Sequence, residues 1–301
     1  MNVKKFKTIY LSILIPITVI ICIVSTWYRA FMFTRDVIEF FKGGNAGSFF
    51  TGIGEEIGEA FGNGSFSINP TIKLGDSVEQ EYDVEFKNID IDLAVADVEI
   101  KEADSYRVVV EYPEEYMPEV KVEGDTLIIK HTNEAYKIQI NGWNHIACDV
   151  TIYVPEGSEL GDVNMNVNLG NIEIKDKFIL GDVEIEANLG NVEIENIKAD
   201  DITVQADLGN VEIKKSVIGA LNITAALGDV KVKNTEFTDG IIQDDLGAIE
   251  VEGSFESLEA DCSLGDLQVQ CDNIDEASMD LEADLGSVKV NGKNHGSEYH
   301  R

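Results

Sequence analysis

The sequence predicts an all-β fold, a single-stranded parallel β-solenoid with coils of about 19 residues. A six-residue word beginning with Leu-Gly recurs along the chain, and "LGNVEI" itself occurs at 189–194 and at 208–213. The glycines of seven such words are separated by 20, 19, 19, 19, 18 and 21 residues. Within each period, apolar and polar residues alternate in two short runs, which is typical of half-buried strands. A fixed period of this length, filled with strands, is typical of a solenoid.

The chain opens with a predicted transmembrane signal anchor. Three lysines in residues 1–8 precede an uncharged run at 9–28, long enough to cross a bilayer as a helix. Trp27 and Tyr28 lie where an interfacial aromatic belt is expected, and the small-x-small exit of a cleaved signal peptide is absent. By the positive-inside rule the N-terminus stays in the cytoplasm. We therefore expect a single-pass protein of the cell membrane, with its solenoid outside.

Residues 29–79 are expected to form a juxtamembrane linker with possible short amphipathic helices. Its second half places Phe50, Ile53, Ile57 and Phe61 at helical spacing, with glutamates on the other face. Two interpretations stay open, a contact that lies on the membrane surface and a flexible tether that folds onto the next domain.

The solenoid is expected to span residues 80–290, followed by a polar C-terminal tail at 291–301. In the coil that starts at Leu208, Val211 and Ile213 are expected to point inward on one strand, and Leu221 and Ile223 on the next. The word itself is interpreted as a corner, in which the leucine points inward, the glycine permits a tight turn, and Asn or Asp bonds nearby backbone. The structural corner glycines are Gly170, Gly181, Gly190, Gly209, Gly228, Gly247, Gly265 and Gly286.

Two features of the repeats leave alternatives open. The residues that follow the corner glycines could form an ion-binding edge instead of a purely structural column: Asn171, Asn191, Asn210, Asp229 and Asp266. One coil also departs from the pattern, because Gly240 and Asp244 occupy positions where neighbouring coils have apolar residues. That coil is expected to be bulged or twisted, with Asp244 leaning out, since a buried carboxylate is costly.

The order of the pieces resembles a known bacterial family. "IDIDLAVADVEI" forms a first coil with a degenerate corner at 93–97, "GDTLIIKH" belongs to a hairpin around a Glu-Gly-Asp turn, and "VTIYVPEGSEL" leads into the serial words. Over residues 80–290 this is similar to the "putative adhesin" domains of unknown function, of the YvlB type. The resemblance implies a right-handed β-helix in an envelope protein, often placed beside membrane-stress genes, and no catalytic motif that could be carried over.

The charge is strongly acidic. The whole chain carries a net charge of −33, and the 259 residues after Lys42 hold 17 basic and 54 acidic groups, a net of −37. Nucleic acid is an unfavourable partner for such a chain, because phosphates need Lys and Arg. Glutamates are expected to stack on successive coils: Glu173, Glu184, Glu193, Glu212 and Glu250. The expected partners are therefore the membrane, envelope proteins, cationic peptides or divalent cations, unless the charge serves only solubility.

No motif for catalysis, a cofactor or a metal is found. The histidines, His131, His145, His295 and His300, form no metal-binding motif, and no nucleophile elbow or phosphate loop occurs. A carbohydrate-active enzyme needs a pair of carboxylates in a groove, and coils of 18–21 residues leave no room for the long loops that build one. Cys262 and Cys271 fall on inward positions of adjacent coils, where they could form a disulfide or act as small buried apolar residues.

The sequence thus predicts a membrane-anchored, extracytoplasmic solenoid without enzymatic activity or cofactor, acting in envelope recognition or envelope stress. The alternatives are a surface adhesin or structural envelope protein and, less favoured, a carbohydrate-active β-helix enzyme.

Overall fold

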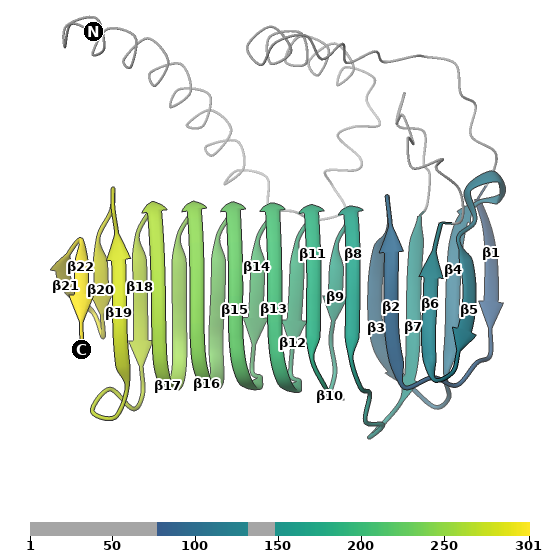
Figure 1. Ribbon diagram of the computed structural model, residues 1–301, viewed down its shortest axis with the longest axis horizontal. Helices are drawn as coiled ribbons and strands as arrows, with labels where there is room; N and C mark the ends of the chain where they lie inside the picture. Colours follow the sequence, from purple (N-terminus) through teal and green to yellow (C-terminus); the bar gives the residue numbers. More distant parts are fainter. Residues whose placement is uncertain (1–76, 132–147) are drawn as a thin grey trace, which may run out of the picture. The chain divides into compact units, whose positions relative to one another are not determined.

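The computed structural model describes residues 77–131 and 148–301, and this part of the chain is a stack of parallel β coils (Figure 1). Each regular coil has three sides. Side one follows the Leu-Gly word, side two is short, and side three leads to the next word. In the coil that follows Leu208, for example, β14 (Val211–Lys214) forms side one, and β15 (Val217–Leu227) covers sides two and three.

The strands of each side pair with their equivalents in the neighbouring coils. Side one consists of β3 (Asp97–Ala103), β9 (Ile172–Ile174), β12 (Val192–Glu195), β14, the beginnings of β16 (Val230–Leu246) and β17 (Ile249–Leu264), β18 (Leu267–Cys271) and β20 (Val288–Val290). Side three consists of β2 (Asn88–Leu93), β8 (Val163–Leu169), β11 (Val183–Leu189), the ends of β13 (Lys198–Leu208), β15, β16 and β17, and β19 (Ser278–Ala283). Side two holds β10 (Ile179–Leu180) and the first residues of β13 and β15.

Equivalent residues of successive coils lie directly above one another. Val192, Val211 and Val230 are partners in one parallel register, as are Ile185, Val204 and Ile223 on side three. Every apolar position that alternation within the strands of sides one and three assigned to the interior is buried, whereas the leucines of the repeated word are not. The inward-facing pattern is therefore confirmed, and like side chains stack into one continuous core.

Side two was not expected from the sequence. Its interior is filled by a mixed set of side chains, including Phe178, Ile218 and the two rings of Phe237 and Phe255, which stack with centroids 5.0 Å apart. Because only one or two inward positions per coil belong to this side, alternation is too short to reveal it.

At the N-terminal end, the order along the chain differs from the order in the stack. After the coil of β2 and β3 the chain forms β4 (Arg107–Pro113), a single 3₁₀ turn η1 (Glu114–Tyr116) and the hairpin of β5 (Glu119–Glu123) and β6 (Thr126–Lys130), which turns at Gly124 as expected. β6 then pairs with β2, and β7 (Asp149–Pro155) pairs with β3, so the later strands cover the earlier coil. β4 lies antiparallel to β7, and β1 (Ser77–Tyr82) lies antiparallel to β4.

The C-terminal residues also form strands. β21 (Lys293–Gly296) pairs antiparallel with β20, and β22 (Glu298–His300) pairs antiparallel with β19. The expectation that residues 291–301 form a tail beyond the solenoid is therefore wrong. The segment is polar because it adds mostly backbone hydrogen bonds, with Tyr299 packed against the core. It covers the edge strands of the last coil, which would otherwise expose unpaired backbone groups.

Several expectations fall on residues outside the described ranges. They are the cytoplasmic residues 1–8, the anchor at 9–28, and nearly all of the linker at 29–79, together with Cys22 and His145. Among the described residues, no helix combines the length and hydropathy that a membrane crossing requires.

The corner glycines are explained by close approach between coils. A Cβ atom built on Gly190, Gly209 or Gly228 would lie 1.8–1.9 Å from the carbonyl oxygen of the equivalent glycine in the preceding coil. Each of these residues also has a positive φ, between 150° and 155°. Gly181 belongs to a different corner, at the start of side three, where its Cβ would lie 2.9 Å from Asp162 Oδ1.

We predict that Gly209→Ala lowers the free energy of unfolding by well over the cost of a strained φ alone, which is about 1–2 kcal/mol for an L-residue. The matched variant is Gly124→Ala, because Gly124 has φ +67° but no heavy atom within 4 Å of its would-be Cβ. Urea unfolding of both purified variants measures the difference. Equal losses would show that backbone conformation, and not the close approach of coils, selects glycine at the corners.

Candidate binding surfaces

The leucines of the repeated word point outward, not inward. We call this row the leucine ridge: Leu169, Leu189, Leu208, Leu227, Leu246, Leu264 and Leu285. Five of them are exposed, with 40% to 72% of their surface accessible, and the other two are half-buried. The expectation of inward leucines was wrong because strict alternation stops before the corner. After the buried Ala187, the side chains of both Asn188 and Leu189 face solvent. Leu189 is then paired with Leu208 of the next coil, whereas Asn188 has no partner in this register.

The polar residues that follow the corner glycines form a hydrogen-bonded column. The side-chain oxygen of Asn171 accepts from the backbone N–H of Asn191 at 3.0 Å, Asn191 accepts from Asn210 at 2.9 Å, and Asn210 accepts from Asp229 at 2.9 Å. Asp229 and Asp266 continue the pattern toward the next coils. These oxygens satisfy backbone donors at the corner, which supports the structural interpretation over an ion-binding edge.

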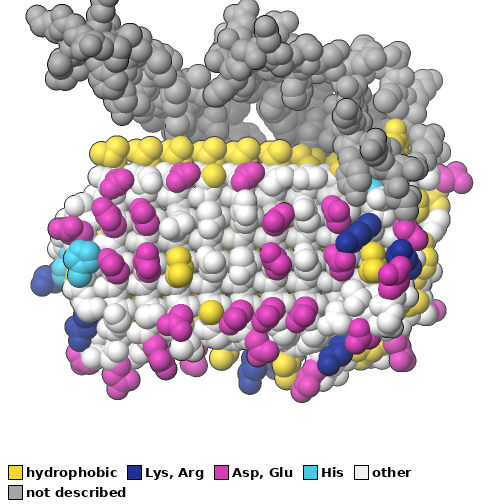
Figure 2. Space-filling view, viewed as in Figure 1, with side chains coloured by type: hydrophobic (Ala, Val, Ile, Leu, Met, Phe, Trp, Pro, Cys, Tyr) yellow, Lys and Arg dark blue, Asp and Glu magenta, His cyan; other side chains and the backbone are white. Residues whose placement is uncertain are grey.

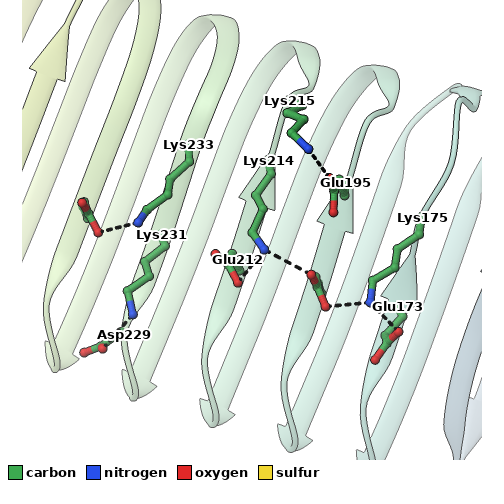
Figure 3. A network of polar contacts seen from close by, with 11 residues as sticks. Glu173, Lys175, Glu195, Glu212, Lys214, Lys215, Asp229, Lys231 and Lys233 are labelled. Carbon is green, nitrogen blue, oxygen red and sulfur yellow. Dashed lines mark hydrogen bonds and ion pairs between the residues drawn. The ribbon is translucent and has the colours of Figure 1, made fainter. Parts of the chain in front are cut away.

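Side one carries a network of ion pairs on its outer surface (Figure 3). Lys175 lies 2.7 Å from Glu173 and 2.9 Å from Glu193, and Lys214 lies 3.2 Å from Glu193 and 3.0 Å from Glu212. Partial burial alone would raise the pKa of the Glu193 carboxyl, but hydrogen bonds from the two lysines outweigh burial and lower that pKa. The stacked glutamates of this side are therefore neutralised by lysines of the same chain.

Side three carries acidic side chains that are not paired with lysine or arginine, although His300 lies beside Asp280. Glu184, which the sequence analysis placed in one ladder with Glu173, lies on this side instead, beside Asn164 and Thr203. From β8 to the corner after β19, the outward positions of side three hold no Lys or Arg, and their carboxylates are Glu184, Glu186, Asp207, Asp245, Glu259, Asp261, Asp280, Glu282 and Asp284. We call this surface the acidic face. Figure 2 shows it, with the ridge as a row of hydrophobic side chains along its upper edge.

A shallow groove of about 420 Å³ lies over side two and the start of side three. Its walls include Ile179, Val217, Ile218 and Gly219, and its charged groups are Lys198 and Asp200. The pair of carboxylates that a glycosidase requires is not among these lining residues.

The cysteines and histidines of the described residues are dispersed. Cys148, Cys262 and Cys271 are buried free thiols, so the disulfide between the last two is not formed. Cys262 lies on side three and Cys271 on side one, and burial raises the pKa of the Cys262 thiol to about 11. His300 Nδ1 lies 2.7 Å from Asp280 Oδ1, and no group of three or more potential metal ligands occurs in the described ranges.

Asp244 is buried, contrary to expectation. Its coil keeps the parallel register at Gly240 and Asp244, and the irregularity in this region falls between Val232 and Thr235. Only 2% of Asp244 is exposed, and its Oδ2 atom has no hydrogen-bond partner. Burial raises the pKa of this carboxyl to about 7, with a further contribution from nearby Asp229 and Asp245. The void beside Gly240 is filled by the Phe237 ring, 2.6 Å from the would-be Cβ, so the coil needs no bulge there.

A family model described as Toastrack DUF4097 matches residues 86–301. The chain belongs to the Toastrack DUF4097 family. The resemblance seen in the sequence is thereby confirmed, and the matched region includes all regular coils of this Toastrack domain. No curated protein matches the chain.

Similar solved structures come from species of Bacteroides and Parabacteroides. A "putative adhesin" from Bacteroides fragilis is 18% identical, covering 74% of this chain and 100% of that one, with a TM-score of 0.48. A "putative adhesin" from Parabacteroides merdae is 12% identical, covering 72% and 96%, with a TM-score of 0.49. A "putative lipid binding protein" from Parabacteroides distasonis is 17% identical, covering 73% and 96%, with a TM-score of 0.44.

Sequence reasoning missed the ridge and the segregation of charge between sides. A signal for the ridge was present, since all seven words keep Leu whereas inward positions vary among Val, Ile, Leu, Met and Ala. For the charges, the signal was lysine two residues after a glutamate on side one, as in Glu173 with Lys175 and Glu212 with Lys214. Period-two alternation puts such residues on the same outer surface.

We predict that Asp244→Ala stabilises the domain and that the gain grows with pH. The pKa of the Asp244 carboxyl is about 7 in the folded protein and near 4 in the unfolded chain, so the folded protein binds this proton more tightly. The wild-type protein therefore keeps its full stability below about pH 4 and loses stability as the pH rises toward about 7. At pH 8 the variant should be more stable by a few kcal/mol, and at pH 4 by much less. Urea unfolding between these pH values measures the slope, with exposed Asp245→Ala as the control. If the stability of Asp244→Ala changes with pH as steeply as that of the wild-type protein, the raised pKa does not belong to Asp244.

Proposed function

We propose that this Toastrack protein is a membrane-anchored, extracytoplasmic recognition component of the cell envelope that binds cationic partners and has no enzymatic activity. The observation that carries the proposal is the asymmetry of charge between two sides of one solenoid. Side one pairs its glutamates with lysines, whereas the acidic face leaves nine carboxylates without a Lys or Arg on the same surface. Solubility alone requires no such segregation.

The acidic face suits an extended cationic partner. Its outward columns run along the stack, and between β17 and β19 they place carboxylates of neighbouring coils about 5 Å apart, the spacing of parallel strands. Asp280 lies beside Glu259, and Glu282 beside Asp261. Like charges this close repel, and a peptide with several lysines relieves the repulsion of these two pairs while it also contacts the other carboxylates of the face. Cationic peptides that act on membranes are therefore the preferred partners, and divalent cations are the second candidate.

The absence of enzymatic activity is part of the proposal. It is supported by the short coils, by a groove whose charged lining is one lysine and one aspartate, and by buried thiols of raised pKa. A surface adhesin or structural envelope protein is the alternative role, in which the same face would bind a basic surface of another cell component.

Binding of an oligolysine peptide to the full-length chain tests the proposal. We expect heat by calorimetry at low salt and a fall in affinity with rising salt, since the contacts are exposed ion pairs. Replacing Glu184, Glu186, Glu259, Asp261 and Glu282 with their amides should weaken binding and flatten the salt dependence. The matched control replaces Glu99, Glu195, Glu250, Glu252 and Glu193 on side one, which removes the same charge. If the two sets of substitutions weaken binding equally, the peptide responds only to the net charge of the chain and not to the acidic face. If salt does not affect binding, the peptide must bind in a preformed pocket.

Protease treatment of wall-stripped cells tests the predicted topology. The three lysines of residues 1–8, followed by the uncharged run at 9–28, support a cytoplasmic N-terminus and an extracytoplasmic solenoid. Added protease should therefore remove the solenoid from intact spheroplasts and spare a cytoplasmic marker protein. Protection of the solenoid until the membrane is lysed would contradict an extracytoplasmic location.

A further inference from the structure

The leucine ridge is a straight apolar strip with a strict repeat. Leu169, Leu189 and Leu208 are partners in one parallel register, and Leu227, Leu246 and Leu264 continue it. With strands about 4.8 Å apart, seven leucines span about 29 Å. Each leucine covers part of the next, yet five stay exposed to 40% or more. A continuous apolar strip of this kind is uncommon on a soluble surface and indicates an interface.

Two columns of residues flank the ridge, one on each side. The column on the acidic face precedes the leucines and consists of Asn168, Asn188, Asp207, Ala226, Asp245, Ser263 and Asp284. The column on the side-one edge is Asn171, Asn191, Asn210, Asp229, Ala248, Asp266 and Ser287. In the first two coils both flanking residues are Asn. In each of the next five, one flanking residue is Asp and the other is Asn, Ala or Ser.

This pattern matches a second copy of the chain placed ridge to ridge in the parallel orientation. A two-fold axis along the stack puts each coil opposite the same coil of the other copy, and it brings the acidic-face column against the side-one column. Asp207 then faces Asn210, Asp245 faces Ala248, and Asp284 faces Ser287. No coil brings two carboxylates together across the ridge. The antiparallel arrangement would oppose Asp207 to Asp245, and Asp229 to its own copy.

We propose that the leucine ridge is the contact surface of a parallel homodimer. A second copy is the partner whose leucines repeat at the same spacing along the whole ridge, because it has the same coils. An α-helix, by comparison, advances about 5.4 Å per turn and falls out of step with the coils. Isologous contacts around a two-fold axis are also the commonest form of homo-oligomer.

The dimer is weak and strengthens with salt. The ridge is one side chain wide, so the contact buries far less than the roughly 800 Å² per partner of a standard interface. Each copy carries a net charge of −33, and the repulsion between them is screened as ionic strength rises. This dependence is opposite to that of a cationic peptide on the acidic face. Dimerisation and the proposed peptide binding can therefore fail independently.

Cysteine cross-linking of the full-length chain in a mild detergent tests the dimer. Leu189→Cys and Leu264→Cys are made separately, because each residue meets its own equivalent in a parallel pair. Each variant should yield a disulfide-linked dimer upon mild oxidation, several-fold more than the wild-type chain, with the yield rising from low to high salt. Thr224→Cys, on the acidic face beside the ridge, is the matched control and should yield little. The native thiols of the described residues are buried and add little background.

A second change on the Leu189→Cys background checks that the ridge itself forms the contact. Leu227→Glu should abolish the cross-link, whereas Asn222→Glu, which adds the same charge on the acidic face, should leave it. Cross-linking only in a mixture of the Leu189→Cys and Leu264→Cys chains would overturn the parallel arrangement in favour of the antiparallel one. Equal yields from Thr224→Cys, or no dimer from any ridge cysteine while the chain still binds oligolysine, would overturn the proposal. The proposal would also be overturned if the ridge cysteines reacted freely with a thiol reagent and became protected only when lipid vesicles were added. In that case the ridge would bind a lipid surface.

Discussion

The close vertical stacking of backbone at the Leu-Gly corner is the constraint on which the rest of this structure depends. The carbonyl oxygen of one glycine lies where the Cβ of the next would be, at 1.8–1.9 Å for the central coils. Only a residue without a side chain permits that approach. Because the corner repeats with little change, the strands on either side enter their sheets in the same register in each coil. A continuous core, a straight ridge and flat faces all follow from this fixed stacking.

Polar side chains support the corner in a way that depends on the same geometry. The Asn and Asp residues after the glycines each accept a hydrogen bond from the backbone of the next coil, so the ladder is shared between coils. Where Ala248 interrupts the column, it still donates its own N–H to Asp229 but offers no side-chain oxygen to the next coil. At the second corner of each coil, Asn196, Lys215 and Asn234 adopt positive φ values of 67°, 50° and 50°. Two of these three are Asn, the non-glycine residue that tolerates this conformation best.

Most of the solenoid could be predicted from the sequence, because a period near 19 residues and alternation of apolar residues report stacking and facing directly. The interior of sides one and three, the first coil at 88–103 and the hairpin at Gly124 follow from these patterns. What could not be predicted depends on where alternation stops. Leu189 faces outward because the chain turns after Ala187, and side two is too short to show a period. Asp244 was expected to avoid the interior on the rule that carboxylates are costly to bury, but the register of its neighbours holds it inside. The binding surfaces were harder still, since the compensation of Glu193 by Lys175 and Lys214 depends on residues from three coils.

The antiparallel strands at the two ends of the stack define how this architecture can vary. The outermost strands of sides one and three are β1 and β5 at the N-terminal end and β21 and β22 at the last coil, and each pairs antiparallel with its inner neighbour, so the parallel strands of the coils do not form the exposed edges. The coils between them are nearly interchangeable in backbone, and each one carries its own share of the core and of the leucine ridge. Gain or loss of a single repeat unit would lengthen or shorten the core and the ridge by the same step while leaving the ends intact. The length of the contact surfaces in this protein is therefore a quantity that duplication of short sequence segments can adjust, independently of the chemistry displayed on them.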